Sequence, residues 1–168
     1  LATLRGFVTN TKHDYLWHQH CNTLATVLDR VESGEIKRLM IFMPPQNGKT
    51  ELTSRQFPAY ALHKNPKRKI ILVSYAADHA FRIARDAREN YTKTGAELRE
   101  DAAAVHDWMT REGGGMVSAG MGGPITGMGA DIAIIDDPIK NAEEAYSLTV
   151  QDNQWTWYKT TFYTRLRP

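Results

Sequence analysis

Three short, continuous runs of apolar residues constrain the fold of this chain more than any other feature. They are "KRLMIFM" at 37–43, "RKIILVSY" at 68–75 and "DIAIIDDP" at 131–138. Apolar runs of this length without alternating polar residues are typical of strands buried on both faces of a parallel sheet. The last run closes on two aspartates and a proline, which predicts that the strand ends there.

The segments between these runs have the periodicity of helices. Apolar side chains recur at three- and four-residue spacing over 15–34 and 77–95, and a further helix is predicted over 48–64, with a step near Pro58 because an interior proline lacks a backbone donor. A last helix is expected from Ser147 or Thr149 onward. Strands that alternate with long helices indicate βαβ units, so we expect an α/β fold with a mostly parallel sheet flanked by helices.

The region between the second and third runs is less regular. Residues 93–114 show no clear period and are predicted to be partly loop, whereas "GMVSA" at 115–119 is a candidate strand. "GMGGPITGMGA" at 120–130 is so rich in glycine that a loop with unusual backbone angles is expected.

Length and composition predict one compact intracellular domain. The chain has 168 residues, 42% of them hydrophobic, and no apolar run approaches the roughly 20 residues that a membrane span requires. Cys21 is the only cysteine, which excludes an intramolecular disulfide and favours a buried thiol. A net charge of +2 is too small to indicate nucleic-acid binding by itself, so any DNA surface must be a local patch.

The stretch "MPPQNGKTEL" at 43–52 is interpreted as a phosphate-binding loop between a strand and a helix. Its first position is Met43, where such loops have glycine, and two prolines follow that cannot donate a backbone hydrogen bond. The backbone N–H groups that can surround a phosphate remain, and we expect nucleotide contacts from five consecutive residues. These are Gln46, Asn47, Gly48, Lys49 and Thr50.

The predicted roles within this site follow from charge and hydroxyl chemistry. Lys49 is expected to reach the β and γ phosphates of ATP, and the Thr50 hydroxyl to bind Mg²⁺. At the end of the third apolar run, Asp136 is the candidate metal ligand and Asp137 the candidate carboxylate that activates the attacking water. An ordinary turn or helix cap is the alternative interpretation of these two aspartates.

Taken in order, four segments resemble the large subunit of the terminase of tailed bacteriophages: "LMIFMPPQNGKTEL", "KIILVSYAADHA", "GGPITGMGADIAIIDDPIKNAEEA" and "WYKTTFYTRLRP". The resemblance implies a RecA-like, ASCE-type P-loop ATPase domain that uses ATP and Mg²⁺. Residues 1–168 would then be an N-terminal ATPase domain, a fragment without the nuclease domain and the last strands of the ATPase. The implied catalytic residues are Lys49 and Asp137.

The same resemblance places Trp17, His18 and Gln19 near the adenine, although a core tryptophan beside two solvated polar residues is an equal alternative. It also identifies two departures from the family pattern. No arginine stands in the loop, where Pro45 and Gln46 are found, and Met128 occupies the place of a basic residue between two glycines. Low ATPase activity of the isolated chain is therefore expected, unless an arginine elsewhere supplies the charge. The candidates are Arg111, Arg165 and Arg167.

Two further patterns in the sequence are weaker. His18, His20 and Cys21 could suggest a metal site, but residues two apart point to different sides of a helix. The basic run "KNPKRK" at 64–69 and three arginines, Arg82, Arg85 and Arg88, could contact DNA phosphates or simply be solvated.

The implied function is a motor that drives double-stranded DNA into a procapsid in the host bacterial cytoplasm. Its implied partners are the DNA, the portal protein, the small terminase subunit and further copies in a homo-oligomeric ring, with no membrane. Two alternatives stay open: another ATP-dependent nucleic-acid translocase such as a helicase, and a catalytically silent interaction module derived from a prophage.

Overall fold

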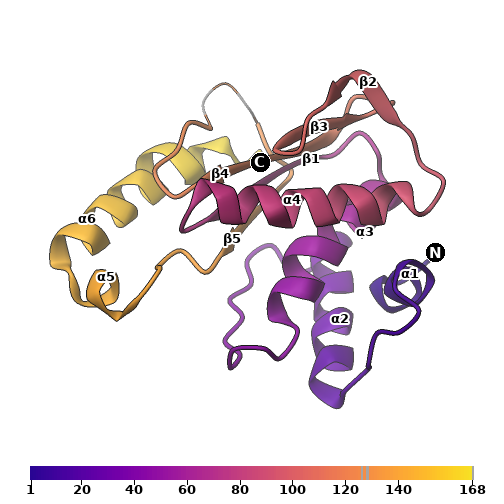
Figure 1. Cartoon of the computed structure of the whole chain (residues 1–168), viewed down its shortest axis with the longest axis horizontal. Helices are drawn as coiled ribbons and strands as arrows, with labels where there is room; N and C mark the ends of the chain where they lie inside the picture. Colours follow the sequence, from indigo (N-terminus) through magenta and orange to yellow (C-terminus); the bar gives the residue numbers. More distant parts are fainter. Residues whose placement is uncertain (126, 128, 168) are drawn as a thin grey trace.

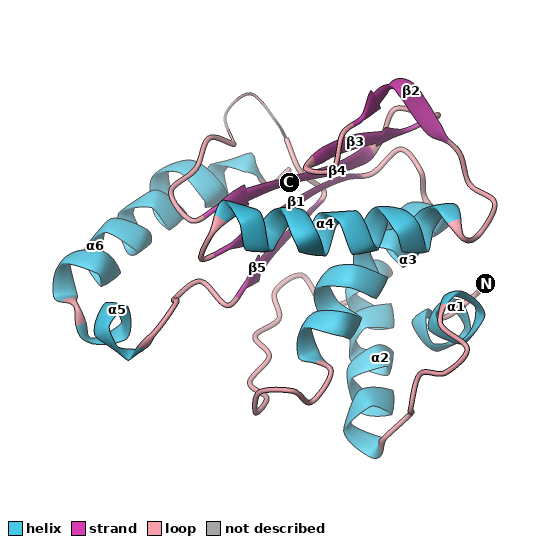
Figure 2. Ribbon diagram, viewed as in Figure 1, coloured by secondary structure: helices cyan, strands magenta, loops and turns pink. Residues whose placement is uncertain are grey.

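A computed structural model gives the structure of residues 1–125, 127 and 129–167, and its elements are shown in Figures 1 and 2. The strands are β1 (Lys69–Ser74), β2 (Leu98–Ala103), β3 (Asp107–Thr110), β4 (Gly115–Gly120) and β5 (Ile132–Asp136). The helices are α1 (Leu4–Thr11), α2 (Gln19–Glu32), the π-helical η1 (Glu51–Gln56), α3 (Phe57–Lys64), α4 (Ala77–Thr92), α5 (Ala142–Tyr146), α6 (Leu148–Trp157), the π-helical η2 (Tyr158–Phe162) and the 3₁₀ turn η3 (Tyr163–Arg165).

The five strands form one mixed sheet in the order β2-β3-β4-β1-β5. β1 pairs in parallel with both β4 and β5, whereas β2, β3 and β4 are antiparallel neighbours. The predicted α/β fold is thus confirmed, whereas the sheet, which was expected to be mostly parallel, is mixed and has a parallel core. The expectation that 93–114 is partly loop was incomplete, since β2 and β3 lie there. β2 has the sequence "LREDAA" and lies at the sheet edge with an irregular register. Because most of its residues are polar, no apolar pattern in the sequence predicts this strand.

Alternate residues of β1 point to two separate cores. Ile70 and Leu72 pack with the helices α1 to α4, whereas Ile71 and Val73 pack on the other face with Ile125, Ala130 and Phe162. Figure 1 shows α4 lying across the first face and α5 and α6 extending from the opposite end of the molecule. The first face is therefore the better covered, and it is the face from which the 44–50 loop approaches.

The predicted strand at 37–43 is wrong. The run pairs with none of the strands that the structure describes, and Met40 and Phe42 are 80% and 89% exposed. Arg38 contacts the Tyr163 hydroxyl at one end, and Lys49 contacts Asp137 beyond the other, so the segment passes beside β5 without joining it. Among the described residues the run forms no backbone ladder with β5, whose outer edge is left unpaired, and a strand requires such a ladder.

β5 is itself less buried than expected for the same reason. It was predicted as a strand covered on both faces, and its residues before Asp136 are only half-buried because it lies at the sheet edge. The strand nevertheless ends where its two aspartates predict.

The predicted helices are present with shifted boundaries. The helix expected over 15–34 is α2, the one over 77–95 is α4, and the one over 48–64 becomes η1 followed by α3. Pro58 lies in the first turn of α3, so the predicted step occurs where the π-helix ends. The last predicted helix is α6 with η2 and η3, and α1 and α5 had not been expected. In the described part of the chain, no helix combines the length and apolarity needed to span a membrane.

Candidate nucleotide-binding site

The segment 44–50 forms a tight loop that leads into the helix beginning at Lys49. Gln46 and Gly48 both have positive φ, at 61° and 81°, and the Asn47 side-chain amide donates to the carbonyls of Pro44, at 3.3 Å, and Pro45, at 2.9 Å. Within the described part of the chain, the backbone N–H groups of residues 46–48 donate to no protein acceptor. A concave loop with such free donors ahead of a helix is suited to an anion.

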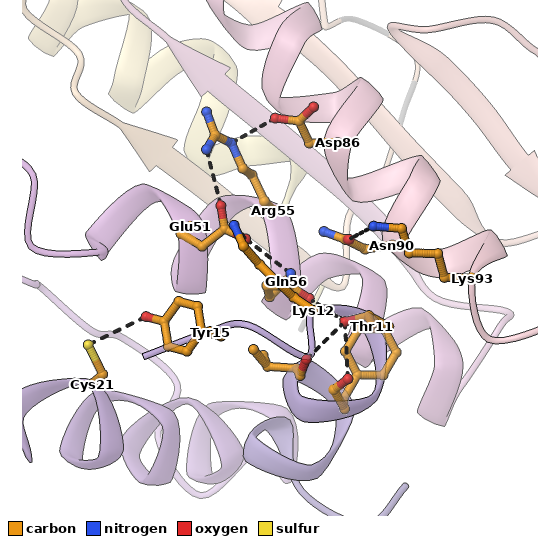
Figure 3. Close-up of polar contacts among 12 residues, drawn as sticks. Thr11, Lys12, Tyr15, Cys21, Glu51, Arg55, Gln56, Asp86, Asn90 and Lys93 are labelled. Atoms are coloured by element: carbon orange, nitrogen blue, oxygen red, sulfur yellow. Dashed lines mark hydrogen bonds and ion pairs between the residues drawn. The ribbon is translucent and has the colours of Figure 1, made fainter. Parts of the chain in front are cut away.

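Tyr15 and the first turn of α2 contact the loop. An ideal Cβ placed on Gly48 would lie 3.0 Å from the Tyr15 hydroxyl and 3.7 Å from Cys21 Sγ. The Tyr15 hydroxyl donates to Cys21 Sγ at 3.4 Å, as Figure 3 shows, and a His20 ring nitrogen lies 3.2 Å from the Asn47 carbonyl oxygen. Burial and the contact with Cys21 raise the pKa of Tyr15 well above its usual value, so its hydroxyl stays protonated.

Sequence reasoning missed Tyr15 and His20 as neighbours of the loop. The only available signal was their position, because they flank the three residues 17–19 that had been singled out. Cys21 had been predicted as a buried thiol, and it is 2% exposed.

Trp17 and His18 contact Tyr15 and His20, the residues that adjoin the loop. The Trp17 ring packs edge-on against Tyr15 at 4.8 Å, with the Arg5 guanidinium 5.4 Å from its centre. His18 caps α2 in an extended conformation, and its ring stacks on His20 at 5.7 Å. Because His18 precedes the first helical turn, the argument that His18 and His20 point apart was wrong. In residues 1–125, 127 and 129–167, no three His, Cys, Asp or Glu side chains gather as a metal site.

Lys49 joins the loop to the carboxyl end of β5. Its Nζ contacts Asp137 Oδ1 directly and lies 3.9 Å from Asp136 Oδ1. Asp136 is 3% exposed and Asp137 52% exposed, so one carboxylate is buried in the sheet end and the other faces solvent. Asp137 has φ of 46°, and its carbonyl accepts a hydrogen bond from the Tyr75 N–H at 3.1 Å. Lys49, Asp136 and Asp137, three of the candidate site residues from the sequence, therefore lie together.

The buried carboxylate has the chemistry of a metal-site residue. Asp136 Oδ2 is buried and has no hydrogen-bond partner among the described residues. A buried, unsatisfied carboxylate oxygen is costly unless a cation or its water completes it. With the Thr50 hydroxyl at the start of the helix, Asp136 fits a Mg²⁺ ion, which prefers oxygen ligands and retains several waters.

A polar network lies directly behind the loop, between η1, α4 and the segment 11–14 (Figure 3). Glu51, the residue after Thr50, accepts from Gln56 at 3.0 Å and from Arg55 at 3.1 Å, and pairs with Lys12 at 3.3 Å. Burial opposes ionisation of Glu51, but these donors outweigh it and hold the pKa of its carboxyl below the usual value. Arg55 also pairs with Asp86 of α4 at 2.9 Å, so the network ties the helix after the loop to α4.

The arginines considered as sources of catalytic charge lie elsewhere. Arg167 pairs with Asp131 at 3.2 Å, the Arg165 guanidinium donates to the Thr161 carbonyl at 3.3 Å, and Arg111 pairs with Glu97. Asp131, the partner of Arg167, precedes β5, whereas Asp136 ends this strand. Because five strand residues span about 16 Å, Arg167 lies at the far end of β5 from the two aspartates. Met128 falls outside the described residues.

The basic candidates for DNA contact divide into two groups. Arg68 is engaged with Glu32 at 2.6 Å, and Arg88 donates to the Ala103 carbonyl at 2.5 Å, so both have structural partners. Arg82 and Arg85 are exposed on α4.

A comparison with protein families decides the relationship. Residues 40–168 match the family described as terminase large subunit, T4likevirus-type, N-terminal. The chain belongs to this family. The match includes the loop and both aspartates but begins after Tyr15, Trp17 and His20, and it makes the chain a member of the DNA-packaging ATPases of phages. No curated protein matches the chain.

Proposed function

We propose that this terminase domain binds ATP with Mg²⁺ at the 44–50 loop and hydrolyses it to drive double-stranded DNA into a procapsid. The observation that carries the proposal is the position of the Lys49 ammonium. It lies at the mouth of a loop with free N–H donors and contacts the two carboxylates that end β5. Nucleotide specificity and hydrolysis are inferred from this geometry together with the family.

In the proposed reaction, the phosphate chain lies against the N–H groups of residues 46–50 and Lys49 Nζ. In the present structure the Asp137 carboxylate occupies the place of an anionic partner of Lys49. Nucleotide binding would substitute phosphate oxygens for that carboxylate and free Asp137 to orient and deprotonate a water molecule. Thr50 and Asp136 would hold Mg²⁺, which neutralises charge on the phosphates when bound.

Trp17 and His18 are proposed to border the base, since they adjoin the loop through Tyr15 and His20. Because Arg111, Arg165 and Arg167 have partners away from the site, a positive charge at the γ-phosphate would come from a second copy of the chain. This is consistent with a homo-oligomeric ring, with the portal protein and the small terminase subunit as further partners.

The test is titration of the purified chain with a fluorescent ATP analogue in the presence of Mg²⁺. Lys49→Ala should lower the affinity at least tenfold, because a charge-assisted contact to phosphate contributes about 1.5–3 kcal/mol. Lys67→Ala is the matched control, since Lys67 is an exposed lysine in the turn between α3 and β1, outside the 44–50 loop. Equal affinities of both variants and the unmodified chain would refute the phosphate loop. Binding without any turnover would instead favour the silent interaction module.

A further inference from the structure

Two buried polar atoms without partners lie on neighbouring strands at the carboxyl end of the sheet. Ser74 Oγ ends β1 and Asp136 Oδ2 ends β5, and neither forms a hydrogen bond within the described residues. Ser74 is 0% exposed and Asp136 is 3% exposed. Nothing in the sequence patterns or in the family match assigns a role to Ser74.

The sheet register places both side chains on the same face. Ser74 and Asp136 are direct partners in the parallel β1–β5 ladder, two residues beyond the pair Leu72 and Ile134. Side chains alternate along a strand, so Ser74 and Asp136 point to the same side as Leu72 and Ile134. That side is the core covered by α1 to α4, from which Lys49 reaches to 3.9 Å from Asp136 Oδ1.

Other hydroxyls on this face have partners. Ser118 of β4 donates to the His106 carbonyl at 3.3 Å, and Thr53 of η1 donates to the Lys49 carbonyl at 2.8 Å. A buried hydroxyl left without a partner destabilises the folded protein by about 1–3 kcal/mol, whereas alanine at the same position would not. The Ser74 hydroxyl without a partner is therefore a local cost to stability, and among the described residues it lies beside Asp136 Oδ2, a buried carboxylate oxygen that also lacks a partner.

We propose that Ser74 is a positioning residue of the Mg²⁺–nucleotide site. Mg²⁺ retains several waters, and a water in its hydration shell has two hydrogens to donate. Ser74 Oγ and Asp136 Oδ2 together accept these two hydrogen bonds, which satisfies both orphaned atoms and fixes the orientation of the Asp136 carboxylate. Residues of this outer layer commonly change metal affinity by about 10- to 100-fold. The inference rests on the proposed function and deepens it.

The experiment combines a stability measurement with a binding measurement on Ser74→Ala. Without nucleotide or metal, thermal unfolding should show the variant to be as stable as the unmodified chain or more stable, because an unsatisfied hydroxyl has been removed. Titration with a fluorescent ATP analogue in Mg²⁺ should show affinity lower by about tenfold. In EDTA, where no metal is bound, the two proteins should bind the analogue equally.

Ser118→Ala is the matched control, since it removes a buried hydroxyl from the same face that has a partner. It should lower the thermal stability and leave the Mg²⁺-dependent affinity unchanged. Loss of stability in Ser74→Ala equal to that of Ser118→Ala would overturn the proposal, as would unchanged Mg²⁺-dependent affinity. If the unmodified chain binds the analogue no better in Mg²⁺ than in EDTA, the proposed function fails together with this inference. A Mg²⁺ effect that Ser74→Ala fully retains overturns the role of Ser74 alone.

Discussion

Replacing Gly48 by alanine should reveal how firmly Tyr15 and the first turn of α2 hold the 44–50 loop. Two separate costs are expected from the structure. Gly48 has φ of 81°, and a left-handed backbone costs a non-glycine residue about 1–2 kcal/mol. The reduced freedom of the unfolded alanine chain offsets about 0.4–1 kcal/mol of this.

The second cost is steric. The new Cβ would lie 3.0 Å from the Tyr15 hydroxyl, which must shift by a few tenths of an ångström. Tyr15 is held by Cys21 Sγ at 3.4 Å and by the edge of Trp17 at 4.8 Å, so the shift is resisted. Overpacking of this kind costs about 1–3 kcal/mol, and the total destabilisation expected for Gly48→Ala is about 2–3 kcal/mol.

A double-mutant cycle with Tyr15→Phe separates the two costs. Phenylalanine lacks the oxygen that the new methyl group meets, so it should relieve the steric cost and leave the backbone cost. Urea unfolding of the four proteins should give a coupling free energy of about 1 kcal/mol, with the double mutant more stable than the sum of the single changes predicts. A coupling energy within about 0.3 kcal/mol of zero would show that Tyr15 does not restrict the loop, and the reasoning would be refuted.

Two further perturbations address the charges around the loop. Asp136→Ala should lower the Mg²⁺-dependent nucleotide affinity by about tenfold or more. Asp137→Asn should retain nucleotide binding and lower the rate of hydrolysis by about 10²–10⁴. Equal loss of binding in both variants would contradict the separate roles of the two aspartates. Glu51→Gln should destabilise the protein by about 1–3 kcal/mol at pH 7, measured by urea unfolding. Because the folded-state pKa of Glu51 lies below the ordinary 4.5, its ionised form stabilises the protein above that pH, and the difference from Glu51→Gln should disappear as the pH falls through the folded-state pKa. A difference that stays constant from pH 7 to pH 3 would contradict the ion-pair network.

The sequence by itself determined strands β1 and β5 and the residues at their carboxyl ends. β1 and β5 were predictable because they are short apolar runs, and α2 and α4 because their apolar side chains recur with a helical period. The chemistry of "NGKT" and of the two adjacent aspartates made Lys49, Asp136 and Asp137 candidates for one site, and their side chains lie together in the structure. Each of these patterns depends only on residues that are close together in the chain, so the sequence is sufficient to find it.

Only the tertiary structure decided which apolar run joins the sheet and which polar atoms are left without partners. The run at 37–43 has the composition of a strand, but a strand exists only where a neighbour supplies hydrogen bonds, and none of the described strands does so. The opposite holds for the polar strand β2. It forms because β3 supplies backbone hydrogen bonds to it, although the sequence of β2 has no apolar pattern. The packing of α2 brings Tyr15 to Gly48, and the register of β1 on β5 places Ser74 beside Asp136. Contacts between residues so far apart in the chain leave no periodic signal in the sequence.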